Sequence, residues 1–599
     1  MWPRELTTRT APCLLALVVG AAFAAGGIGD QEDDDRIPPQ LSSTPFQSDF
    51  GVVATGSPEA TRAASAVLER GGNAVDAAVT AALALGVADF DASGIGGATN
   101  IVIRLANGHV TAIDGTSSVP GSIDLEAFGR AKTAQRRFGV EYIAVPTTLA
   151  TLQLALDRYG TISMAEALQP AISIAERGFL LSEIQNVWTA YYHEDIIEAS
   201  PFLRFFIMTD GINIGAAGEL QCRPVLAQTL RRLAREGVES FYRGSIADEI
   251  EREMIAHGGF LRKADLAGLL VREVNPLETT YRGRRVISFP APGGGPTLIA
   301  GLDILEAFPI DFLATDSVER LNVLVEALRL ARASRVMAFF KKPQYGARAG
   351  QITKKQASLL AQAIRPGSVI TEESLTPKID PKCLPSGEST TQVSVIDQWG
   401  NTVSMTQSLA RSFGTKFMTP EHGFPYNSFV EAFNATDPRC PGYLRPNMPC
   451  GTDMAPTIVV DEGRSVTALG TPGSMGIPSI LSIVISNLVD RELSPADAVN
   501  SPRVLWGGSE ELSAYLEVFG PISEADAEQF AALGHTRVIP VRFPSDPVDM
   551  ATGGGVNLAH HDLSSGRFTG VIDGRRGGLA LGPWVVIQPE PSPRNLQSD

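Results

Sequence analysis

A hydroxyl side chain stands where a proline-rich stretch gives way to a strand pattern. Residues 365–388 contain four prolines and little periodicity, which predicts an exposed connector. Directly after it, Ser389-Thr390-Thr391 opens an alternating run that predicts a β-strand. A threonine at the first residue of a strand, behind an exposed connector, is the arrangement needed for chain cleavage that exposes a new N-terminus at Thr390.

An N-terminal threonine can act as a nucleophile without a separate histidine. Its own α-amine has an unperturbed pKa of about 7.7 to 8.0, so it can accept the hydroxyl proton near neutral pH. Before cleavage, the same hydroxyl can attack the preceding carbonyl, shift the acyl group from nitrogen to oxygen, and leave an ester that water hydrolyses. The local pattern also has a plainer interpretation, because threonine is common in strands for its β-propensity.

Hydrophobic periodicity predicts the elements around this threonine. Residues 393–397 and 402–409 alternate around the turn Gln398-Trp399-Gly400-Asn401, which predicts a β-hairpin that begins at Thr390. The other expected elements are a hairpin at 101–113, helices from 58, from 73, near 323–330 and over 478–490, a mostly helical stretch at 147–273, and strands at 457–460 and 466–469. The pattern predicts an α/β protein whose first half is rich in helices.

Composition argues against several classes of partner. The chain has 599 residues, 44% of them hydrophobic, and a formal charge of -16, so it can form a large core but lacks the basic excess that binds phosphate backbones. We expect no nucleic-acid partner. The seven histidines form no metal-binding motif, and Gly94-Ile95-Gly96-Gly97 and Gly293-Gly294-Gly295 lack the spacing of phosphate loops. We therefore expect no metal and no cofactor.

The first residues have the pattern of an export signal. Arg4 and Arg9 precede the apolar run 11–25, and Ala22-Phe23-Ala24 offers small residues to a signal peptidase. The run is shorter than the roughly 20 residues of a spanning helix, so we interpret residues 1–24 as a signal peptide, with a membrane anchor as the alternative. Residues 25–49 predict a mobile leader. We expect an exported protein, periplasmic or extracellular, without stable membrane insertion.

Four cysteines follow the predicted signal, at positions 222, 383, 440 and 450. An oxidising compartment permits disulfides among them. Cys440 and Cys450 bracket a loop rich in Pro and Gly, so one interpretation is a bridge between them. The alternative is free, buried thiols.

Ordered motifs span most of the chain. They are Glu69-Arg70-Gly71-Gly72-Asn73-Ala74-Val75-Asp76-Ala77-Ala78, Ser93-Gly94-Ile95-Gly96-Gly97, Phe241-Tyr242-Arg243-Gly244, Thr390-Thr391 with Asp397 and Gly400-Asn401, Ala455-Pro456-Thr457, Thr471-Pro472-Gly473, Ser501-Pro502-Arg503 and Asp573-Gly574-Arg575-Arg576. Together, over about residues 51–582, they resemble the γ-glutamyltransferase (γ-glutamyltranspeptidase) family of N-terminal nucleophile hydrolases. The number and order of the matches make the resemblance specific.

The resemblance implies an α/β fold of the four-layer αββα type. It implies a large subunit, residues 50–389, and a small subunit, residues 390–599, that stay associated after cleavage. Thr390 falls on the nucleophile, and Ser408 on a hydroxyl that orients it. Gly473 and Ser474 fall on two glycines whose backbone N–H groups form the oxyanion hole, and a serine can supply the same main-chain donor. This set implies an amidase or acyltransferase that works through an acyl-enzyme on Thr390.

Several positions that hold the γ-glutamyl group depart from the family pattern. Where the family has an arginine that binds the α-carboxylate, this chain has Thr116, so the bidentate cation is missing. An asparagine beyond the orienting hydroxyl becomes Ala410, and a nearby glutamine becomes Phe429.

The remaining pocket positions differ as well. The acidic residue that grips the α-amine aligns with Ala432, and Glu431 beside it is a possible replacement. The paired serines become Thr452 and Asp453, and an aspartate there is expected to repel a carboxylate.

We therefore expect a family enzyme with an altered acyl pocket. Its partners would be a small-molecule acyl amide as donor and water or an amine as acceptor. One alternative is a true γ-glutamyltransferase or glutathione hydrolase. Another is an inactive member that acts as a binding protein, but Thr390, Ser408 and Gly473 favour an enzyme.

Overall fold

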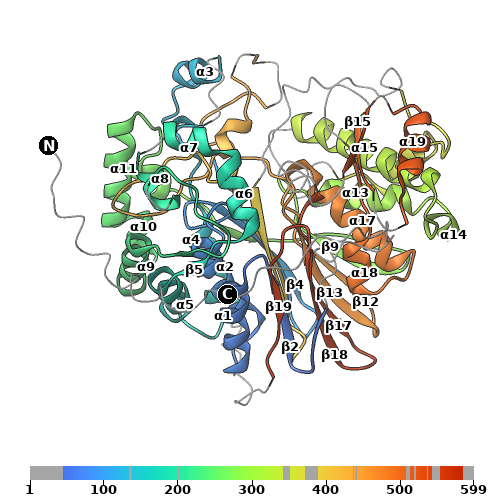
Figure 1. The fold of residues 1–599 in the computed structure, drawn as a ribbon, viewed down its shortest axis with the longest axis horizontal. Coiled ribbons are helices and arrows are strands. Elements are labelled where there is room, and N and C mark those ends of the chain that lie inside the picture. Colours follow the sequence, from blue (N-terminus) through green and yellow to red (C-terminus); the bar gives the residue numbers. More distant parts are fainter. Residues whose placement is uncertain are drawn as a thin grey trace, which may run out of the picture.

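Two seven-stranded sheets form the centre of the molecule (Figure 1). The structure is a computed structural model that describes residues 45–133, 138–199, 201–208, 211–341, 351–371, 389–435, 437–438, 442–506, 513–518, 521–535, 537–541 and 553–584. The first sheet contains, in spatial order, β19 (Leu579–Leu581), β2 (Gly51–Thr55), β10 (Ser389–Asp397), β11 (Thr402–Ala410), β3 (Ala98–Arg104), β4 (Val110–Gly115) and β7 (Arg272–Val274).

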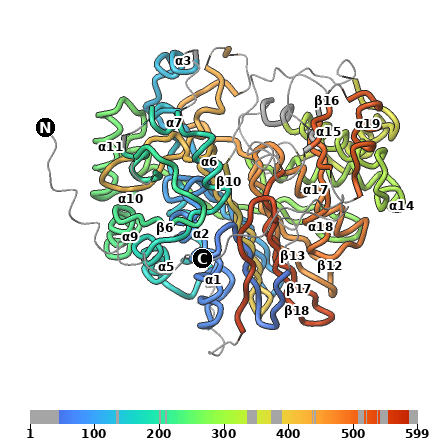
Figure 2. Tube along the Cα trace, viewed as in Figure 1, coloured from blue at the N-terminus to red at the C-terminus, as the bar shows by residue number. Residues whose placement is uncertain are grey.

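The second sheet contains, in spatial order, β1 (Phe46–Ser48), β18 (Arg567–Ile572), β17 (Asn557–Asp562), β13 (Ser465–Gly470), β12 (Thr457–Asp461), β9 (Arg284–Ser288) and β8 (Leu277–Tyr281). All neighbouring strands in both sheets are antiparallel. Strands from the two ends of the sequence pair directly, β1 with β18 and β2 with β19, so blue and red segments lie side by side in Figure 2.

Helices cover the outer face of each sheet (Figure 1). Over the first sheet lie α1 (Pro58–Glu69), α2 (Ala74–Ala88), α4 (Thr148–Tyr159), α5 (Met164–Arg177), α9 (Pro224–Glu236), α10 (Glu239–Tyr242) and α11 (Ser245–His257). Over the second lie α13 (Gly295–Leu305), α15 (Val318–Lys341), α16 (Lys354–Ala361), α17 (Ile477–Val489), α18 (Pro495–Asn500) and α19 (Glu524–Ala532). A third apolar cluster, which includes Val52, Val102 and Ile458, joins the facing sheets. The predicted four-layer αββα fold is confirmed.

Shorter elements complete the structure. The remaining helices are α3 (Leu125–Thr133), α6 (Glu183–Tyr191), α7 (His193–Ala199), α8 (Pro201–Ile207), α12 (Lys263–Ala267) and α14 (Ile310–Leu313). The remaining strands are β5 (Phe179–Leu180) and β6 (Leu220–Gln221), which pair, and β14 (Val504–Trp506), β15 (Ser513–Glu517) and β16 (Arg537–Val541), which form a third sheet.

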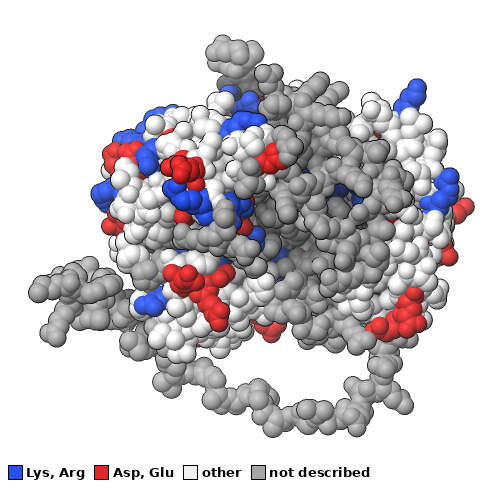
Figure 3. Space-filling model, turned by 90° about the horizontal axis from the view of Figure 1, so that it is seen from above, with Lys and Arg blue, Asp and Glu red and all other residues white. Residues whose placement is uncertain are grey.

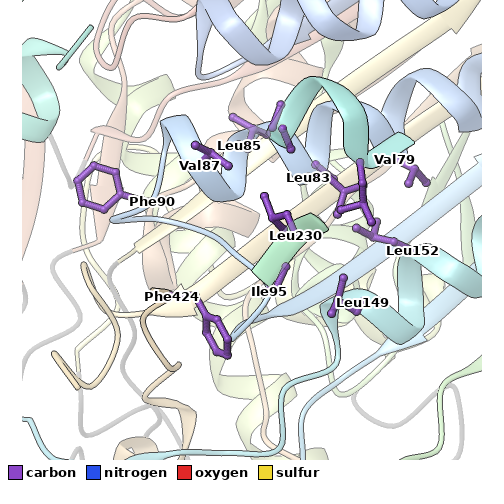
Figure 4. Close-up of a cluster of buried hydrophobic side chains, with 14 of the residues drawn as sticks. Val79, Leu83, Leu85, Val87, Phe90, Ile95, Leu149, Leu152, Leu230 and Phe424 are labelled. Atoms are coloured by element: carbon purple, nitrogen blue, oxygen red, sulfur yellow. The ribbon is translucent and has the colours of Figure 1, made fainter. Parts of the chain in front are cut away.

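The α2 helix is buried along its whole length and packs against β10 and β11. The Asn73 side chain accepts hydrogen bonds from the backbone of Val75 and Asp76, and the Asp76 carboxylate accepts one from Asn73 N, so a capping box fixes where the helix begins. Its apolar side chains meet those of α4 and α9, as Figure 4 shows for Leu149, Leu152 and Leu230. α2 is therefore a rigid support behind the predicted nucleophile strand.

The hairpin predicted at residues 393–409 is confirmed as β10 and β11. Asp397 shapes its turn, because Oδ1 accepts hydrogen bonds from the backbone N–H groups of Trp399 and Asn401. Asp397 Oδ2 accepts one from Ala74 N at 2.9 Å, which ties the hairpin to the N-terminus of α2. Burial raises the pKa of Asp397 to about 6, although these hydrogen bonds favour its ionised form.

The structure differs from the sequence prediction at the edges of two segments. Residues 46–48, the end of the predicted leader, form strand β1. The start of the predicted connector is packed, since the Asn322 side chain donates to the carbonyls of Arg365, Pro366 and Ser368. The predicted signal peptide and residues 372–388 of the connector lie outside the described residues. Within the described ranges, no helix is long and apolar enough to cross a membrane.

Two motifs from distant parts of the sequence meet in one buried ionic network. Asp573 contacts Arg503 at 2.6 Å and Arg575 at 2.9 Å, and all three side chains are at most 1% exposed. Arg575 also pairs with Glu517 at 2.6 Å. Burial opposes the charge of Asp573, but the two arginines outweigh it and hold its pKa below the usual range. The network joins the end of β18 to α18 and β15.

Removal of one carboxylate from this network should destabilise the protein. We expect Asp573→Ala to lower the free energy of unfolding by about 3–5 kcal/mol, because it leaves a buried guanidinium without its partner. Denaturant unfolding followed by tryptophan fluorescence measures the change. Glu126→Ala, which breaks the exposed pair with Arg130, is the control and should cost less than about 1 kcal/mol. Equal effects of the two substitutions would contradict the network's role.

Candidate active site

Two hydroxyl groups lie opposite each other at the start of β10. The pairing of β10 with β11 sets Thr390 against Ser408, and an irregularity in the register falls between Ser389 and Thr390. Thr390 Oγ1 donates a hydrogen bond to Ser408 Oγ at 3.2 Å. The Ser408 hydroxyl donates in turn to the carbonyl oxygen of Ser389. The two hydroxyls thus connect the predicted nucleophile to the carbonyl of the peptide bond that precedes it.

A loop that follows α2 holds both strands at this point. The backbone carbonyl of Asp91 accepts hydrogen bonds from Ser389 Oγ at 3.1 Å and from Phe413 N at 2.8 Å. The carbonyl of Ala92 accepts one from Leu409 N at 3.1 Å. Residues on both sides of the hairpin are therefore fixed by one short segment of the large-subunit region.

Two acidic side chains of this loop lie behind the strand, and sequence reasoning missed them. The Asp89 side chain bonds to the Thr391 hydroxyl, and Asp91 lies near enough for the two charges to interact. Burial raises the pKa of Asp89 to about 8, with the charge of Asp91 adding to the shift, and burial raises the pKa of Asp91 to about 6. Arg576 opposes both shifts. The available signal was two acidic residues directly after an apolar helix.

The described residues bound a small cavity beside Thr390. Its volume is about 40 Å³, and its lining includes Thr390, Ser408, Ala410, Phe429, Ala432, Gly451, Thr452, Asp453, Met454, Ser474 and Ile477. The structure therefore brings the predicted nucleophile and its orienting hydroxyl together with Ala410, Thr452, Asp453 and Ser474. A volume of this size can hold water but not a drug-sized ligand.

Gly473 and Ser474 form a tight turn at the edge of this cavity, before α17. Both have positive φ, 133° at Gly473 and 54° at Ser474. A Cβ atom at Gly473 would lie 2.9 Å from Ile480 Cδ1, so this position favours glycine. Ser474 occupies the left-handed region, which a serine can adopt at modest cost. Within the described structure, no hydrogen bond occupies the backbone N–H of either residue.

Asp453 is paired with two arginines that sequence reasoning missed. Asp453 Oδ1 contacts Arg332 Nη1 at 2.5 Å and also accepts a hydrogen bond from Arg335 Nη1. Burial alone would raise the pKa of Asp453, but the two guanidinium charges outweigh it and hold the pKa below the usual range. The arginines lie 121 and 118 residues before Asp453, so no local pattern announces them. Asp453 is predicted to repel a carboxylate, and the positive charges of Arg332 and Arg335 beside it reduce that repulsion.

Glu431, the predicted replacement for the acid missing at Ala432, is paired with an arginine. Its carboxylate accepts hydrogen bonds from both Arg411 Nε and Arg411 Nη2, the second at 2.9 Å. Ala432 lines the Thr390 cavity, whereas Glu431 is not among its described lining residues. No acid replaces the missing one among the described lining residues other than Asp453.

Thr116 lines a different and larger cavity. That cavity has a volume of about 610 Å³, and its walls include Asp114, Arg272, Pro292 and Asn447. Thr116 Oγ1 is buried and has no hydrogen-bond partner among the described residues. The structure thus separates Thr116 from the other predicted binding residues, although Pro292 accepts a hydrogen bond from Thr452 N and so links the two walls.

Cys450 is a free, buried thiol, so the suggested Cys440–Cys450 bridge is wrong. Cys440 lies outside the described residues. Cys222 is disulfide-bonded, and Cys450 is not its partner. Burial raises the pKa of the Cys450 thiol well above its usual range, which makes it unreactive.

The site shows no feature of a resident metal in its described part. No group of three or more His, Cys, Asp or Glu side chains that could hold a metal ion occurs in the ranges that the structure covers.

Acidic and basic side chains are interspersed on the described surface seen in Figure 3.

The chain has four layers around two antiparallel sheets, with Thr390 near the start of a central strand. This is the architecture of the N-terminal nucleophile hydrolases. The model of the family described as Gamma-glutamyltranspeptidase matches residues 60–582. The chain belongs to the gamma-glutamyltranspeptidase family and is an enzyme of this group of amidohydrolases and transpeptidases.

Relatives in the family carry two kinds of name. A "Glutathione hydrolase proenzyme" of Pseudomonas sp. (strain A14) is 30% identical over 560 residues, which are 90% of this chain and 96% of that protein. An "Acylase ACY 1 proenzyme" of Pseudomonas sp. (strain V22) is 33% identical over 510 residues, 82% of this chain and 88% of that protein.

Two solved structures resemble this chain in fold. Cephalosporin acylase from Bacillus halodurans shares the fold with a TM-score of 0.80 at 24% identity, covering 94% of this chain and 99% of the other. Helicobacter pylori gamma-glutamyltranspeptidase has a TM-score of 0.50 at 29% identity and covers 58% of this chain and 97% of its own.

The raised pKa of Asp89 predicts a measurable dependence of stability on pH. A carboxyl whose pKa is about 8 in the folded chain, against 3.8 as the ordinary value, stabilises the fold fully below about pH 4. This contribution is lost as the pH rises towards 8, because the unfolded chain then releases a proton that the folded chain keeps. We expect Asp89→Asn to flatten the fall in melting temperature between pH 6 and pH 8.

Thermal unfolding of both chains across this pH range measures the effect. Glu126→Gln, an exposed carboxyl, is the control and should leave the slope unchanged. Buried His535 and half-buried His560, whose pKa values are lowered to about 4, act with the opposite sign at lower pH but equally in both chains. Identical slopes in the wild type and Asp89→Asn would refute the assignment of a protonated Asp89.

Proposed function

We propose that the chain cleaves itself between Ser389 and Thr390 and that Thr390 then acts as the nucleophile of an amidase or acyltransferase whose acyl group is not γ-glutamyl. The observation that carries the proposal is the pair of hydrogen bonds from Thr390 to Ser408 and from Ser408 to the carbonyl of Ser389. The names of the relatives, which include proenzymes of both hydrolase and acylase type, support it.

Self-cleavage follows from this arrangement of hydroxyls. Thr390 Oγ1 attacks the carbonyl carbon of Ser389, its proton passes to Ser408 Oγ, and the Ser408 proton moves onto the developing oxyanion. Collapse of the tetrahedral intermediate re-forms the carbonyl and breaks the bond to Thr390 N, which takes the hydroxyl proton of the intermediate and becomes a free amine. The product is an ester between Ser389 and the Thr390 hydroxyl.

Water completes the cleavage. The 40 Å³ cavity beside Thr390 exceeds the volume that one water needs, and the hydroxyls of Thr390, Ser408 and Thr452 offer it partners. Hydrolysis of the ester leaves a carboxylate on Ser389 and regenerates the Thr390 hydroxyl next to the new amine. That amine is then the base that deprotonates the hydroxyl for each catalytic cycle.

The two products should remain one folded body. The first sheet interleaves β10, β11 and β19 of the small-subunit region with β2, β3, β4 and β7 of the large-subunit region. The second sheet places β12, β13, β17 and β18 between β1 on one side and β8 and β9 on the other. Separation would break both sheets and both helical cores, so the cleaved peptide bond is not what holds the subunits together.

Catalysis by the mature enzyme needs stabilisation of the oxyanion that forms on the substrate carbonyl. We assign this role to the backbone N–H groups of Gly473 and Ser474, which have no acceptor among the described residues; Ser474 lines the Thr390 cavity and Gly473 directly precedes it in the chain. Because the donors are main-chain groups, serine in place of glycine is compatible with the role.

Support for an acyl group other than γ-glutamyl comes from the side chains that line the cavity. Ala410, Phe429 and Ala432 offer no hydrogen bonds, and Thr116 lies in the other cavity. A free α-carboxylate and α-amine would therefore be desolvated without charged partners. A true glutathione hydrolase remains the second candidate, favoured by the 30% identity to that relative over 96% of its length.

Cleavage can be followed on a denaturing gel. We expect the wild type to give two fragments, and mass spectrometry to place the new N-termini at residue 390 and, if residues 1–24 are an export signal, at residue 25. Thr390→Ala should remain one chain. Ser408→Ala should slow cleavage by about 10²-fold or more, because the carbonyl loses its hydrogen-bond donor.

Thr569→Ala is the matched control, because Thr569 lies in strand β18 of the other sheet and is not among the described lining residues of the Thr390 cavity, and it should be cleaved at the wild-type rate. A wild-type chain that stays intact, or a Thr390→Ala chain that is still cut at the same bond, would exclude self-cleavage by Thr390.

The acyl group can be tested with chromogenic anilides. We expect the mature enzyme to hydrolyse simple acyl or glutaryl anilides with kcat/KM at least about 10²-fold above that of γ-glutamyl anilide, because each unpaired buried charge of the γ-glutamyl group costs several kcal/mol. A hydroxylamine acceptor distinguishes transfer from hydrolysis. Efficient turnover of the γ-glutamyl compound would overturn this part of the proposal and favour the glutathione hydrolase.

A further inference from the structure

Two polar atoms, Thr452 Oγ1 and Asp453 Oδ2, have no hydrogen-bond partner among the described residues and belong to side chains that line the cavity beside Thr390. Thr452 and Asp453 both line that cavity. Thr452 Oγ1 is buried and makes no hydrogen bond with any described residue. The Asp453 side chain is only 9% exposed, and both of its arginine partners bond to Oδ1. Its second oxygen, Oδ2, bonds to none of the residues that the structure describes. A buried hydroxyl such as that of Thr452 ordinarily has a partner.

Asp453 is held rigidly in this position. Besides its bond to Asp453, Arg335 donates from Nη2 to the carbonyl of Pro292 at 2.9 Å and to that of Thr452 at 2.6 Å. Arg332 and Arg335 both project from α15, one turn apart, and are 6% and 8% exposed. One planar guanidinium therefore fixes the backbone at Thr452 and the carboxylate at Asp453 together. The free oxygen cannot rotate away without breaking this set of bonds.

The charges of the cluster restrict what Oδ2 can bind. Two guanidinium groups and one carboxylate leave one net positive charge. An ammonium group against Oδ2 would lie close to two buried cations, and at low dielectric that repulsion is large. A carboxylate in the same place would meet the free oxygen of Asp453 directly, and neither oxygen has a proton to donate. An uncharged donor, a hydroxyl or an amide N–H, avoids both conflicts.

We propose that Asp453, with Thr452 beside it, binds an uncharged hydrogen-bond donor on the acyl group of the substrate. The inference rests on the proposed acyl-enzyme at Thr390 and names the class of acyl group that it carries. Because Asp453 and Thr390 line the same small cavity, the donor stands a few bonds from the scissile carbonyl. The substrate class is a short acyl amide with a hydroxyl or carboxamide at its far end.

A series of anilides with equal chain length tests the inference on the wild-type, self-cleaved protein. The acyl groups end in hydroxyl, carboxamide, ammonium, carboxylate or methyl. We expect kcat/KM for the hydroxyl and carboxamide compounds to exceed that of the other three by at least about tenfold, because only they satisfy the charged acceptor. A preference for the ammonium, carboxylate or methyl compound, or no preference, would overturn the inference.

An isosteric variant tests the residue itself. Asp453→Asn puts an amide in place of the carboxylate, so we expect the preference for the uncharged donors to fall by about tenfold or more and the carboxylate compound to gain. Asp490→Asn is the matched control, since Asp490 is a buried aspartate paired with Arg282 outside the cavity, and it should keep the wild-type order. A uniform loss across all five compounds in Asp453→Asn would assign Asp453 a structural role and overturn the inference.

The outcomes separate this inference from the proposed function. If Asp453→Asn fails to fold, as a thermal melt would show, the wild-type series decides alone. Turnover in the wrong order of preference removes the role of Asp453 but leaves Thr390 as the nucleophile. A self-cleaved chain that hydrolyses none of the anilides would overturn the amidase function, and the inference with it.

Discussion

The candidate site depends on one set of contacts at the start of a buried central strand, where the hydroxyls of Thr390 and Ser408 lie against the peptide bond that precedes Thr390. β10 lies between β2 and β11, and its first residues are fixed from the side by the loop at Asp91. Such a position is normally the most inert part of a protein, because its backbone groups are paired and dry. Here burial also holds the Ser408 hydroxyl on the carbonyl of Ser389. Because the folded strands already fix both groups, this placement has no further cost in conformational entropy. The pairing of β10 with β11 therefore builds the sheet and also places the two hydroxyls that the proposed cleavage uses.

The buried charges around this strand follow two different rules. Asp453 and Asp573 each have two arginines, which outweigh burial and keep the carboxylates ionised. Asp89 and Asp91 share only the opposing charge of Arg576, so burial prevails and their pKa values rise. Ionised groups are thus found where an ionic network or a cavity wall needs a fixed charge. Asp89 and Asp91 follow the end of α2, behind the strand, and the raised pKa of about 8 leaves Asp89 mostly protonated at neutral pH.

Local patterns allowed most of the fold to be predicted. The β10–β11 hairpin follows from alternation and from the turn at Asp397, and α2 from its capping residue and its apolar sequence, because these elements depend on neighbours in the chain. The role of Ser408 beside Thr390 was implied by the family resemblance, and the register of the hairpin places the two residues opposite each other. The arginines at 332 and 335, the bidentate partner of Glu431 and the free state of Cys450 could not be predicted. Each depends on side chains brought together by the packing of layers, and sequence spacing carries no information about such contacts.

The candidate catalytic residues match the family pattern, whereas the residues of the candidate acyl pocket depart from it, and this difference has a physical cause. The candidate catalytic half uses groups that tolerate substitution: backbone N–H donors at residues 473 and 474, and a hydroxyl at residue 408 that serine supplies as well as threonine does. The acyl pocket instead uses side-chain charges, whose value depends on every other charge nearby. Replacing a pair of hydroxyl residues by Thr452 and Asp453 requires new cations to be placed behind them, and Arg332 and Arg335 meet that need from α15. Thr116 lies apart from this cluster, because it lines a different cavity from the one that Asp453 lines. The proposed acyl transfer at Thr390 and the proposed choice of acyl group therefore rest on different residues, and the two have to be measured separately.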